Sequence, residues 1–595
     1  MTGPGNFGVS VVVKTKLPQA EVGDPHRKAS WHRAFWLIAT VLGFVQAWAG
    51  RHEMNGDGIP YLDIGDAYLR GDLRAAINAT WSPLYSSLVS FAMLVFKPNA
   101  YWEFALVHLV NFVIYLGALA SFTFFLRQLL DYQEQQKTKV AHERWISPPE
   151  TAWVVLGYSL FIYSSLFWMS PRHVEPDTCV AGFLYLGTAL LLRVRMGKAG
   201  SWTFVALGSV LALGYLSKTI MFYVGILFLL IALLLPAGGR KLRGVALAAI
   251  VFVVLSSPFI VALSRAKGRI TIGDAGKIVY SYYIDSAEPF NWHGEHDTGT
   301  PVHSTRRVFD SPPVYEFATP IGGTYPNWDD PSYWHEGIKP YLNVKRQLKM
   351  IGINISVLWK QISNPFMLGT VAVFLLLFGA AEKSRVALKG LLDCWFLLFP
   401  ALTIIAIYQL IHLEPRYIAP FIVVACLALF FGIRLPDSQT SRRFLKSVTL
   451  TLVVFFAFAV VPPTMRDAYT SFGDLVKRRD AERNYYWQVA HSLNQMGLQP
   501  GDKIASLGAS VTNSKWARLA RVTIVSEIYS SDWPHLVSNS DEETFWASNS
   551  SVKEQVMEVF KKTGARAVVT IPPSGADLAG WQRINNTNFY VRFLS

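Results

Sequence analysis

The chain has 595 residues, of which 51% are hydrophobic and 16% are charged. Because about a quarter of the residues are charged in an ordinary soluble chain, this composition excludes a string of soluble domains. The net charge of +14 is carried by Lys and Arg clustered in short loops between apolar runs. This pattern is typical of cytoplasmic loops in membrane proteins. The sequence contains no basic helix with interleaved aromatic residues, so it does not indicate binding to nucleic acid.

The N-terminal tail, residues 1–33, is polar and basic, and an apolar run at 34–50 follows it. No A-x-A-like cleavage site follows this run, so we predict an uncleaved signal anchor with a cytoplasmic N-terminus. Further apolar runs, close to the ~20 residues that a bilayer core requires, recur up to residue 463. We predict about eleven membrane spans, at 34–50, 103–126, 151–169, 178–193, 202–217, 219–236, 244–262, 366–381, 391–411, 416–433 and 447–463.

The charged loops predict how these spans are oriented. With the N-terminus inside, the basic loops all fall on the cytoplasmic side, as expected, at 127–144, 193–198, 240–243, 383–389 and 434–446. This orientation requires the short apolar stretch 82–96 to lie at the outer interface; an extra crossing elsewhere is the alternative. The stretch 348–365 also looks interfacial, because Lys360 lies within it. We therefore predict a multi-pass protein of the plasma (inner) membrane.

Several polar regions share the outer face in this topology. They are the loops 51–102, 170–177, 265–365 and 412–415, the turn between 217 and 219, and the C-terminal region 464–595. The first loop carries four aspartates, Asp57, Asp63, Asp66 and Asp72. They could be functional, or they could simply cap short helices on the membrane surface.

The second outer loop is very short, yet it holds Arg172, His173, Glu175 and Asp177 between two apolar spans. Ionisable groups so close to hydrocarbon are costly, and they usually have a partner or a function. Asp177 also stands where it could cap the start of the next helix. Both roles remain open, and they are compatible.

Two further cationic residues stand where spans meet the outer face. Lys218 lies in the turn GYLSKT, where it could also snorkel to the membrane surface. The stretch IHLEPRYIAPF carries His412, Glu414, Arg416 and Tyr417 at a helix start. An arginine fork suits the recognition of phosphate, although Glu414 and Arg416 could instead form a structural pair.

The long loop 265–365 is rich in Trp, Tyr, Pro and His. His293, His296, Asp297 and His303 could bind a metal ion, but their spacing does not specify one, and an irregular loop is the simpler interpretation. A lid over a carbohydrate or lipid site is a further possibility for this aromatic-rich segment. The three cysteines contain no CxxC pair, so neither a disulfide framework nor a thiolate metal site is predicted.

The composition changes after Val461-Pro462-Pro463. The stretches PGDKIASLG, RVTIVSEIY, ARAVVTI and FYVRFL read as strands, and SSVKEQVMEVFKKTG has the 3.6-residue apolar period of a helix. Alternating strands and helices predict a small parallel or mixed sheet. The fold class is therefore mostly α, a transmembrane helical bundle with a small C-terminal α/β domain. The stretch LGAS after the first strand lacks G-x-G-x-x-G, so we expect no nucleotide site. We expect instead that this domain binds acceptor or glycan, or packs on the outer face of the bundle.

The outer-face motifs resemble a known family. The stretch DGIPYLDIG, from Asp57, is similar to the D-x-x-x-Y-x-[DE] pattern of GT-C membrane glycosyltransferases. These include the lipid A aminoarabinose transferases, the protein O-mannosyltransferases and the bacterial RgtA/B/C/D-like group. The resemblance continues in order through WSPLY, EPD at Glu175, GYLSK at Lys218 and EPRY at Glu414. It covers roughly residues 34–463.

The resemblance implies a glycosyltransferase with 34–463 as its catalytic domain. Such enzymes take a sugar from a polyprenyl-phosphate carrier and attach it to a glycan, lipid or protein acceptor at the outer face. Asp57 would be the general base of an inverting displacement. Lys218 and Arg416 would stabilise the leaving phosphate. The residues expected to bind substrate are Tyr61, Asp63, Glu175, Asp177, Lys218, Glu414, Arg416 and Tyr417.

Some points stay open in this interpretation. Gly58 follows Asp57 where several relatives have Glu, and Trp81-Ser82-Pro83 stands near the place of the lysine-proline-proline motif of the aminoarabinose transferases. The donor sugar is therefore undetermined. Metal dependence differs among GT-C branches. If a divalent metal is bound, the candidate ligands are Asp57, Asp177, His293 and His296.

Two other classes of function are compatible with a polytopic chain. A transporter or flippase for a lipid-linked substrate should carry ionisable residues near mid-membrane, often within internal repeats, and the sequence shows neither. A scaffold that kept the fold and lost the activity is the other alternative. The gathering of charged residues at one face favours chemistry on a lipid headgroup.

Overall fold

A computed structural model gives the structure of the chain. It describes residues 25–594, apart from 140–144, 147, 237–240, 295–296, 318–320, 365–366, 368, 372–373, 375–389, 434, 437, 478 and 531–540. Most of the predicted N-terminal tail, most of the predicted span 366–381 and the basic loop 383–389 therefore lie outside the described residues.

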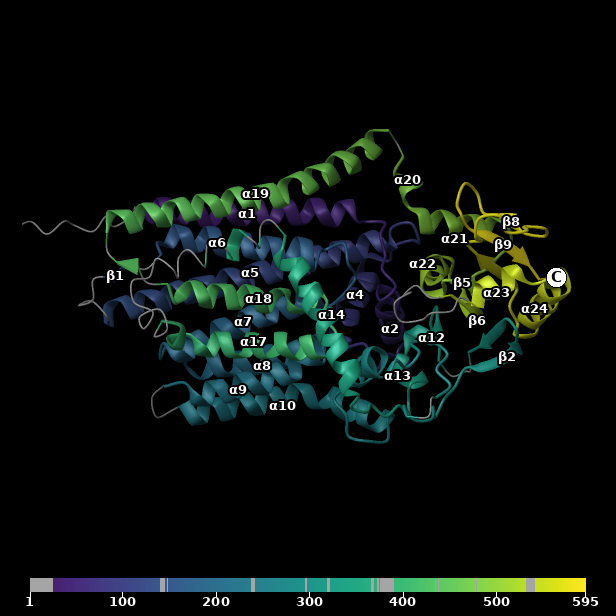
Figure 1. Cartoon of the computed structure of the whole chain (residues 1–595), viewed down its shortest axis with the longest axis horizontal. Helices are drawn as coiled ribbons and strands as arrows, with labels where there is room; N and C mark the ends of the chain where they lie inside the picture. Colours follow the sequence, from purple (N-terminus) through teal and green to yellow (C-terminus); the bar gives the residue numbers. More distant parts are fainter. Residues whose placement is uncertain are drawn as a thin grey trace, which may run out of the picture.

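The membrane part is a bundle of apolar helices that run alongside one another (Figure 1). Among the described residues, five helices are long and apolar enough to cross a membrane, namely Glu103–Gln136, Glu150–Trp168, Asp177–Arg195, Lys241–Ala266 and Gln439–Asp474. The chain is a multi-pass membrane protein. Further apolar helices are shorter: Pro83–Phe96, Ser201–Ser217, Ile220–Leu234, Trp395–Leu410 and Pro415–Phe431.

The bundle helices overlap the predicted spans wherever the structure describes them, although α1, α5 and α19 extend beyond the predicted bounds. They are α1 (Pro25–Ala49), α5 (Glu103–Lys139), α6 (Glu150–Tyr163) with the π-helical η1 (Ser164–Trp168), α7 (Asp177–Arg195), α8 (Ser201–Ser217), α9 (Ile220–Leu234), α10 (Lys241–Ala266), α17 (Trp395–Leu410), α18 (Pro415–Phe431) and α19 (Gln439–Val476). Two short strands, β1 (Trp145–Ile146) and β4 (Leu435–Pro436), pair at the end of the bundle far from the C-terminus (Figure 1).

The centre of the bundle is packed with aromatic rings. Phe122 of α5 stacks on Phe161 of α6 with centroids 4.9 Å apart, and its edge meets Tyr185 of α7 at 5.3 Å. Helices α5 and α7 approach closely because Gly182 faces the backbone of Ala118, where an added Cβ would lie 3.4 Å from the Cα. This aromatic core fixes the helix ends that carry the polar residues.

Three short helices follow α1 at the other end of the bundle: α2 (Gly58–Arg70), α3 (Leu73–Ala76) and α4 (Pro83–Phe96). Helix α4 has 14 residues, about 21 Å of helix against a hydrocarbon core of about 30 Å. Helix α4 is therefore short for a membrane span, which favours the predicted location at the membrane surface. Helix α4 packs on α2, where a Cβ on Gly65 would lie 3.2 Å from that of Ser90.

The long loop after α10 is more ordered than an irregular loop. It forms α11 (Ala275–Tyr280), the π-helical η2 (Ser281–Asp285), β2 (Arg306–Asp310), β3 (Pro313–Glu316), α12 (Pro326–Asp329), α13 (Pro331–Trp334) and α14 (Val344–Ile362). Helices α12 and α13 lie beside α2, between the bundle and the C-terminal domain (Figure 1).

The C-terminal region forms the predicted α/β domain. It contains α20 (Asp480–Arg483), α21 (Tyr485–Gln495), β5 (Lys503–Gly508), α22 (Ser510–Ala520), β6 (Thr523–Tyr529), α23 (Asp541–Ala547), α24 (Ser550–Lys562), β7 (Ala567–Thr570), β8 (Gln582–Arg583) and β9 (Tyr590–Phe593). The sheet order is β2-β3-β6-β5-β7-β9-β8. Strand β5 pairs in parallel with β6 and β7, so the sheet is mixed.

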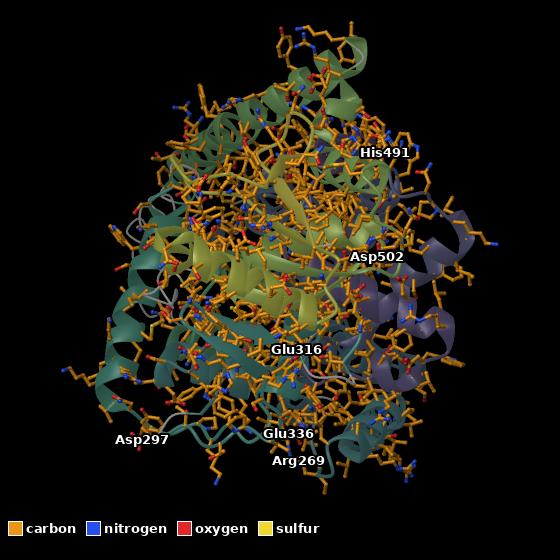
Figure 2. The ribbon with its side chains drawn as sticks, turned by 90° about the vertical axis from the view of Figure 1, so that its right-hand side faces the viewer. Arg269, Asp297, Glu316, Glu336, His491 and Asp502 are labelled. Atoms are coloured by element: carbon orange, nitrogen blue, oxygen red, sulfur yellow. The ribbon has the colours of Figure 1, made fainter. Side chains whose placement is uncertain are left out.

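Two strands of this sheet come from the loop after α10. Strand β3 pairs antiparallel with β6, with Tyr315 opposite Glu527, and β2 pairs with β3 at the sheet edge. The sheet therefore crosses the domain boundary expected at residue 464. Figure 2 looks onto this end of the molecule, with Glu316 of β3 beside the yellow and green C-terminal elements.

A buried charge network holds the C-terminal domain on the bundle. Arg518 of α22 contacts Glu103 of α5 at 2.8 Å, and Asp63 and Asp66 of α2 at 2.6 Å each. Arg518 and Glu103 are 5% and 1% exposed. Because α2 starts directly after Asp57, this network also fixes the start of the helix that carries Asp57 into the site.

Candidate active site

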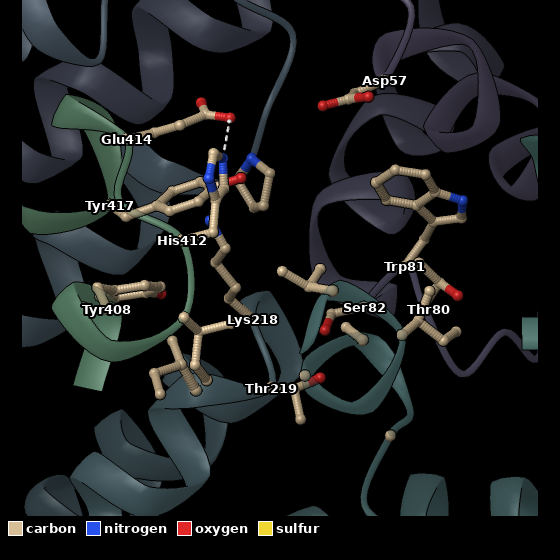
Figure 3. A pocket seen from close by; sticks show the side chains of 18 of the residues that line it. Asp57, Thr80, Trp81, Ser82, Lys218, Thr219, Tyr408, His412, Glu414 and Tyr417 are labelled. Atoms are coloured by element: carbon tan, nitrogen blue, oxygen red, sulfur yellow. Dashed lines mark hydrogen bonds and ion pairs between the residues drawn. The ribbon is translucent and has the colours of Figure 1, made fainter. Parts of the chain in front are cut away.

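A cavity of about 620 Å³ lies at the end of the bundle that carries the C-terminal domain. Its walls come from the start of α2, the start of α7, the turn between α8 and α9, the segment α11–η2, and the junction of α17 and α18. Figure 3 shows Asp57 and Trp81 on one side of it, facing Glu414, His412 and Tyr417 on the other. Segments from one end of several helices thus build one site.

Arg416 is the centre of the acidic part of the cavity. It is the second residue of α18, and its guanidinium pairs with three carboxylates, those of Glu175, Glu414 and Asp57. Nε lies 2.5 Å from Glu414, whereas Nη2 lies 3.5 Å from Asp57 and 3.3 Å from the Tyr417 hydroxyl. The two contacts of Nη2 are long, so this corner of the fork is loosely bound.

Asp57 stands at the N-cap position of α2, but its side chain accepts no capping hydrogen bond from the backbone. The capping explanation for this aspartate is therefore not supported. Burial, partly offset by Arg416, raises the pKa of the Asp57 carboxyl above its ordinary value. A carboxylate with a raised pKa is a stronger base than a surface aspartate.

The neighbouring loops are locked together by Asn55. Its Nδ2 donates to Glu175 Oε1 at 2.9 Å, while its Oδ1 accepts from the backbone N–H of Val174 at 2.9 Å. This residue fixes the Glu175 carboxylate beside Arg416. The sequence analysis did not single out Asn55, because an asparagine before a glycine in a loop carries no distinctive pattern.

A second ion pair lies in the same cavity. Lys218 Nζ donates to Asp177 Oδ1 at 2.6 Å, and the ammonium lies 3.9 Å from the centre of the Tyr417 ring. Asp177 is the first residue of α7, where the helix dipole favours a negative charge. Its other oxygen, Oδ2, is buried without a hydrogen-bond partner in the part of the chain that the structure describes.

Aromatic rings surround these charges. Tyr283 of η2 stacks on His412 with centroids 3.8 Å apart, and His412 Nε2 lies 3.2 Å from Glu414. Tyr61 meets Trp81 edge-on at 5.3 Å. The rest of the wall is largely apolar, with members from α9, α11 and α17: Ile220, Tyr223, Ile278, Val279, Ile407 and Ile411.

The cavity brings together nearly all the residues that the sequence singled out. Those lining it are Asp57, Tyr61, Glu175, Asp177, Lys218, Glu414, Arg416 and Tyr417. Asp63 stands apart, since it binds Arg518 and accepts hydrogen bonds from the N–H and hydroxyl of Thr324. Lys277 and Tyr283, which also line the cavity, were missed because they lie in a long loop without a recognisable motif.

The candidate metal ligands do not form one cluster. Within the described residues, no group of three or more His, Cys, Asp and Glu side chains is placed to hold a metal ion. His293 lies against Tyr315, with ring centroids 5.6 Å apart, and His296 lies outside the described residues. Asp57 and Asp177 line one cavity, where each faces an organic cation, Arg416 or Lys218.

Comparison with known proteins gives matches among solved structures. The chain is similar to ArnT. The match is to ArnT from Cupriavidus metallidurans bound to undecaprenyl phosphate, at 13% identity and a TM-score of 0.49, over 95% of this chain and 98% of that one. An oligosaccharyltransferase from Archaeoglobus fulgidus, in complex with Zn and sulfate, matches at 12% identity and a TM-score of 0.43. This match covers 91% of this chain and 67% of the oligosaccharyltransferase.

No protein-family model matches the chain, and no curated protein matches it.

Proposed function

We propose that the chain is a glycosyltransferase that moves a sugar from a polyprenyl-phosphate donor to an acceptor at the outer face of the plasma membrane. The observation that supports this proposal is the convergence of Asp57 with two cations, Lys218 and Arg416, among further carboxylates in a cavity with an apolar wall. This combination suits a substrate with a phosphate, a lipid chain and a leaving group to be displaced.

The two cations are suited to the phosphate of the donor. As the bond between the anomeric carbon and the phosphate oxygen breaks, negative charge grows on the phosphate, and fixed cations stabilise that charge. The contacts of Arg416 Nη2 with Asp57 and with the Tyr417 hydroxyl are long. A phosphate oxygen can therefore replace these two contacts at little cost. The apolar wall formed by Ile220, Ile407 and Ile411 is suited to the first isoprenoid units.

Asp57 is suited to the role of general base. The acceptor hydroxyl attacks the anomeric carbon, its proton passes to the Asp57 carboxylate, and the polyprenyl phosphate leaves with the electrons of the broken C–O bond. One base near the reactive carbon fits a displacement with inversion. Glu175, Glu414, Asp177, Tyr61 and Tyr417 would orient the two substrates by hydrogen bonds.

The charge distribution along α7 supports the outer location. The helix starts at the cavity with Asp177 and ends with Arg193 and Arg195 in its last turn. Basic residues mark the cytoplasmic ends of membrane helices, so the cavity end would be extracytoplasmic. The C-terminal domain, which lies at the same end (Figure 1), would then be extracytoplasmic and the N-terminus cytoplasmic.

The test is transfer by purified protein. Wild type and the variant Asp57→Asn are supplied with a panel of polyprenyl-phosphate sugars, and sugar transfer and slow donor hydrolysis are measured. We expect the variant to lose at least 100-fold in rate, as expected on removal of a general base. Asp310→Asn, on the exposed strand β2, is the matched control and should keep full activity. Equal turnover by wild type and Asp57→Asn would refute the role of Asp57.

A further inference from the structure

Helix α14 combines three different faces along its 19 residues. The first face packs on the protein and contains Gln347, Ile351, Asn354 and Leu358, which follow the three- and four-residue spacing of one helix side. Asn354 is 1% exposed. This side therefore attaches the helix to the bundle.

The second face is apolar and exposed. Val344, Leu348, Ile355 and Trp359 recur at spacings of four, seven and four residues, which places them on one side of a helix. They are 60%, 63%, 55% and 66% exposed. Large apolar side chains at such exposure would be costly in water, so this side requires an apolar environment.

The third face is basic and lies next to the apolar one. Lys345, Lys349 and Lys360 each follow an apolar-face residue by one position, which rotates them by about 100° around the helix. All three are exposed. An amphipathic helix with a lysine-rich edge is the pattern of helices that lie in the membrane interface and attract anionic lipids.

The location of α14 agrees with this pattern. In Figure 1 the helix runs across the bundle, at a steep angle to α17 and α18, instead of along it. It is tied to the α17–α18 junction, where Asn354 Nδ2 donates to the carbonyl of Gln409 at 3.0 Å and its Oδ1 accepts from the N–H of Leu413 at 3.2 Å. This is the level of the cavity, because His412, which directly precedes Leu413, lines it on one side.

We propose that α14 is a binding surface for anionic phospholipid, with its apolar face in the hydrocarbon boundary and its three lysines on the headgroups. The same helix holds the segment that carries His412 and Glu414. Gln409 Nε2 also donates to the carbonyl of Ile351 at 3.1 Å, so the contact between α14 and this segment is reciprocal. Lipid seated on α14 therefore stabilises one wall of the cavity.

The experiment measures lipid next to Trp359 and needs no turnover, so its result is independent of the proposed transfer activity. Wild-type protein is placed in phosphatidylcholine nanodiscs containing phosphatidylglycerol, with bromine on the acyl chains of either lipid at equal mole fraction. Tryptophan quenching is compared between the two. We expect stronger quenching when phosphatidylglycerol carries the bromine, and the excess should disappear in Trp359→Phe.

The charge requirement is tested with two triple variants. Lys345→Gln/Lys349→Gln/Lys360→Gln should abolish the excess, since each lysine near an anionic membrane surface strengthens the attraction to that surface about fivefold. Lys553→Gln/Lys561→Gln/Lys562→Gln on α24, in the C-terminal domain, removes the same charge and should leave the excess unchanged. No excess in wild type, or an equal excess in the α14 variant, would overturn the proposal.

Discussion

At the residue scale, the cavity is defined by how its carboxylates share two cations. Arg416 pairs with Asp57, Glu175 and Glu414, and Lys218 pairs with Asp177. A guanidinium offers five donors in a rigid fork, whereas an ammonium is a point charge. The two cations are therefore not interchangeable in this site.

This difference predicts the effect of Arg416→Lys. The lysine keeps one positive charge but loses the fork, so it cannot hold Glu175 and Glu414 and still present a donor to phosphate. We expect kcat for sugar transfer to fall by about 100-fold or more, the usual loss when one transition-state donor is removed. Steady-state kinetics with varied donor measure it. Arg307→Lys, on exposed strand β2, is the control; wild-type kinetics in Arg416→Lys would argue against phosphate binding by the fork.

The raised pKa of Asp57 predicts a pH dependence. Burial raises this pKa, and the proposed base acts only when deprotonated. Activity should therefore be full at high pH and fall as the pH decreases through the raised pKa. We expect the acid limb of kcat/KM to lie above pH ~4, the range of an ordinary aspartate. A profile that stays flat down to pH 4 would contradict the assignment.

The sequence could identify most of these residues because each stands at the end of an apolar span. Lys218 and Arg416 are conspicuous there, since charge near hydrocarbon is costly. Asn55 and Tyr283 could not be found in this way. Asn55 acts through hydrogen bonds to a loop far along the chain, and Tyr283 reaches the cavity only because the long loop folds back on the bundle.

At the element scale, hydropathy located the bundle helices well, because a membrane helix needs a continuous apolar run. Strands β2 and β3 were not predicted. Each has five residues or fewer, and their pairing partner β6 lies far along the sequence. Such non-local pairing leaves no periodic signal in a short segment. The sequence therefore predicts an irregular loop at 265–365, where the structure has short helices and two strands.

Helix α14 shows the opposite case. Lys360 within an apolar stretch predicts an interfacial segment at 348–365, and the interfacial location stays a prediction. The helix in the structure starts earlier and ends earlier, at Val344–Ile362, and Asn343 caps its start by accepting from the N–H of Arg346. The contacts with Gln409 and Leu413 could not be predicted, because they depend on tertiary packing.

At the scale of the whole molecule, the bundle and the C-terminal domain share a buried charge network. Arg518 contacts Glu103, Asp63 and Asp66, and none of these four residues lines the cavity. Nearby, Gly56 faces Val511 so closely that an added Cβ would clash with it. The C-terminal domain thus packs directly beside Asp57.

This network predicts the effect of Arg518→Gln. The variant removes the arginine from Asp63, Asp66 and Glu103, of which Glu103 keeps its pair with Arg521. Breaking a buried pair costs about 3 to 5 kcal/mol. Denaturant unfolding of the detergent-solubilised protein measures this loss. Arg566→Gln removes an exposed pair with Asp502 and should cost at most about 1 kcal/mol. Equal stability of the two variants would show that the network does not hold the domains together.

The pairing of β3 with β6 also has a consequence for biosynthesis. Tyr315 is opposite Glu527, so the loop that supplies Tyr283 to the cavity is completed by strand β6, which is synthesised after helix α19. A nascent chain that has inserted α19 still lacks this partner strand. The loop can therefore reach its paired state only after β6 has been synthesised.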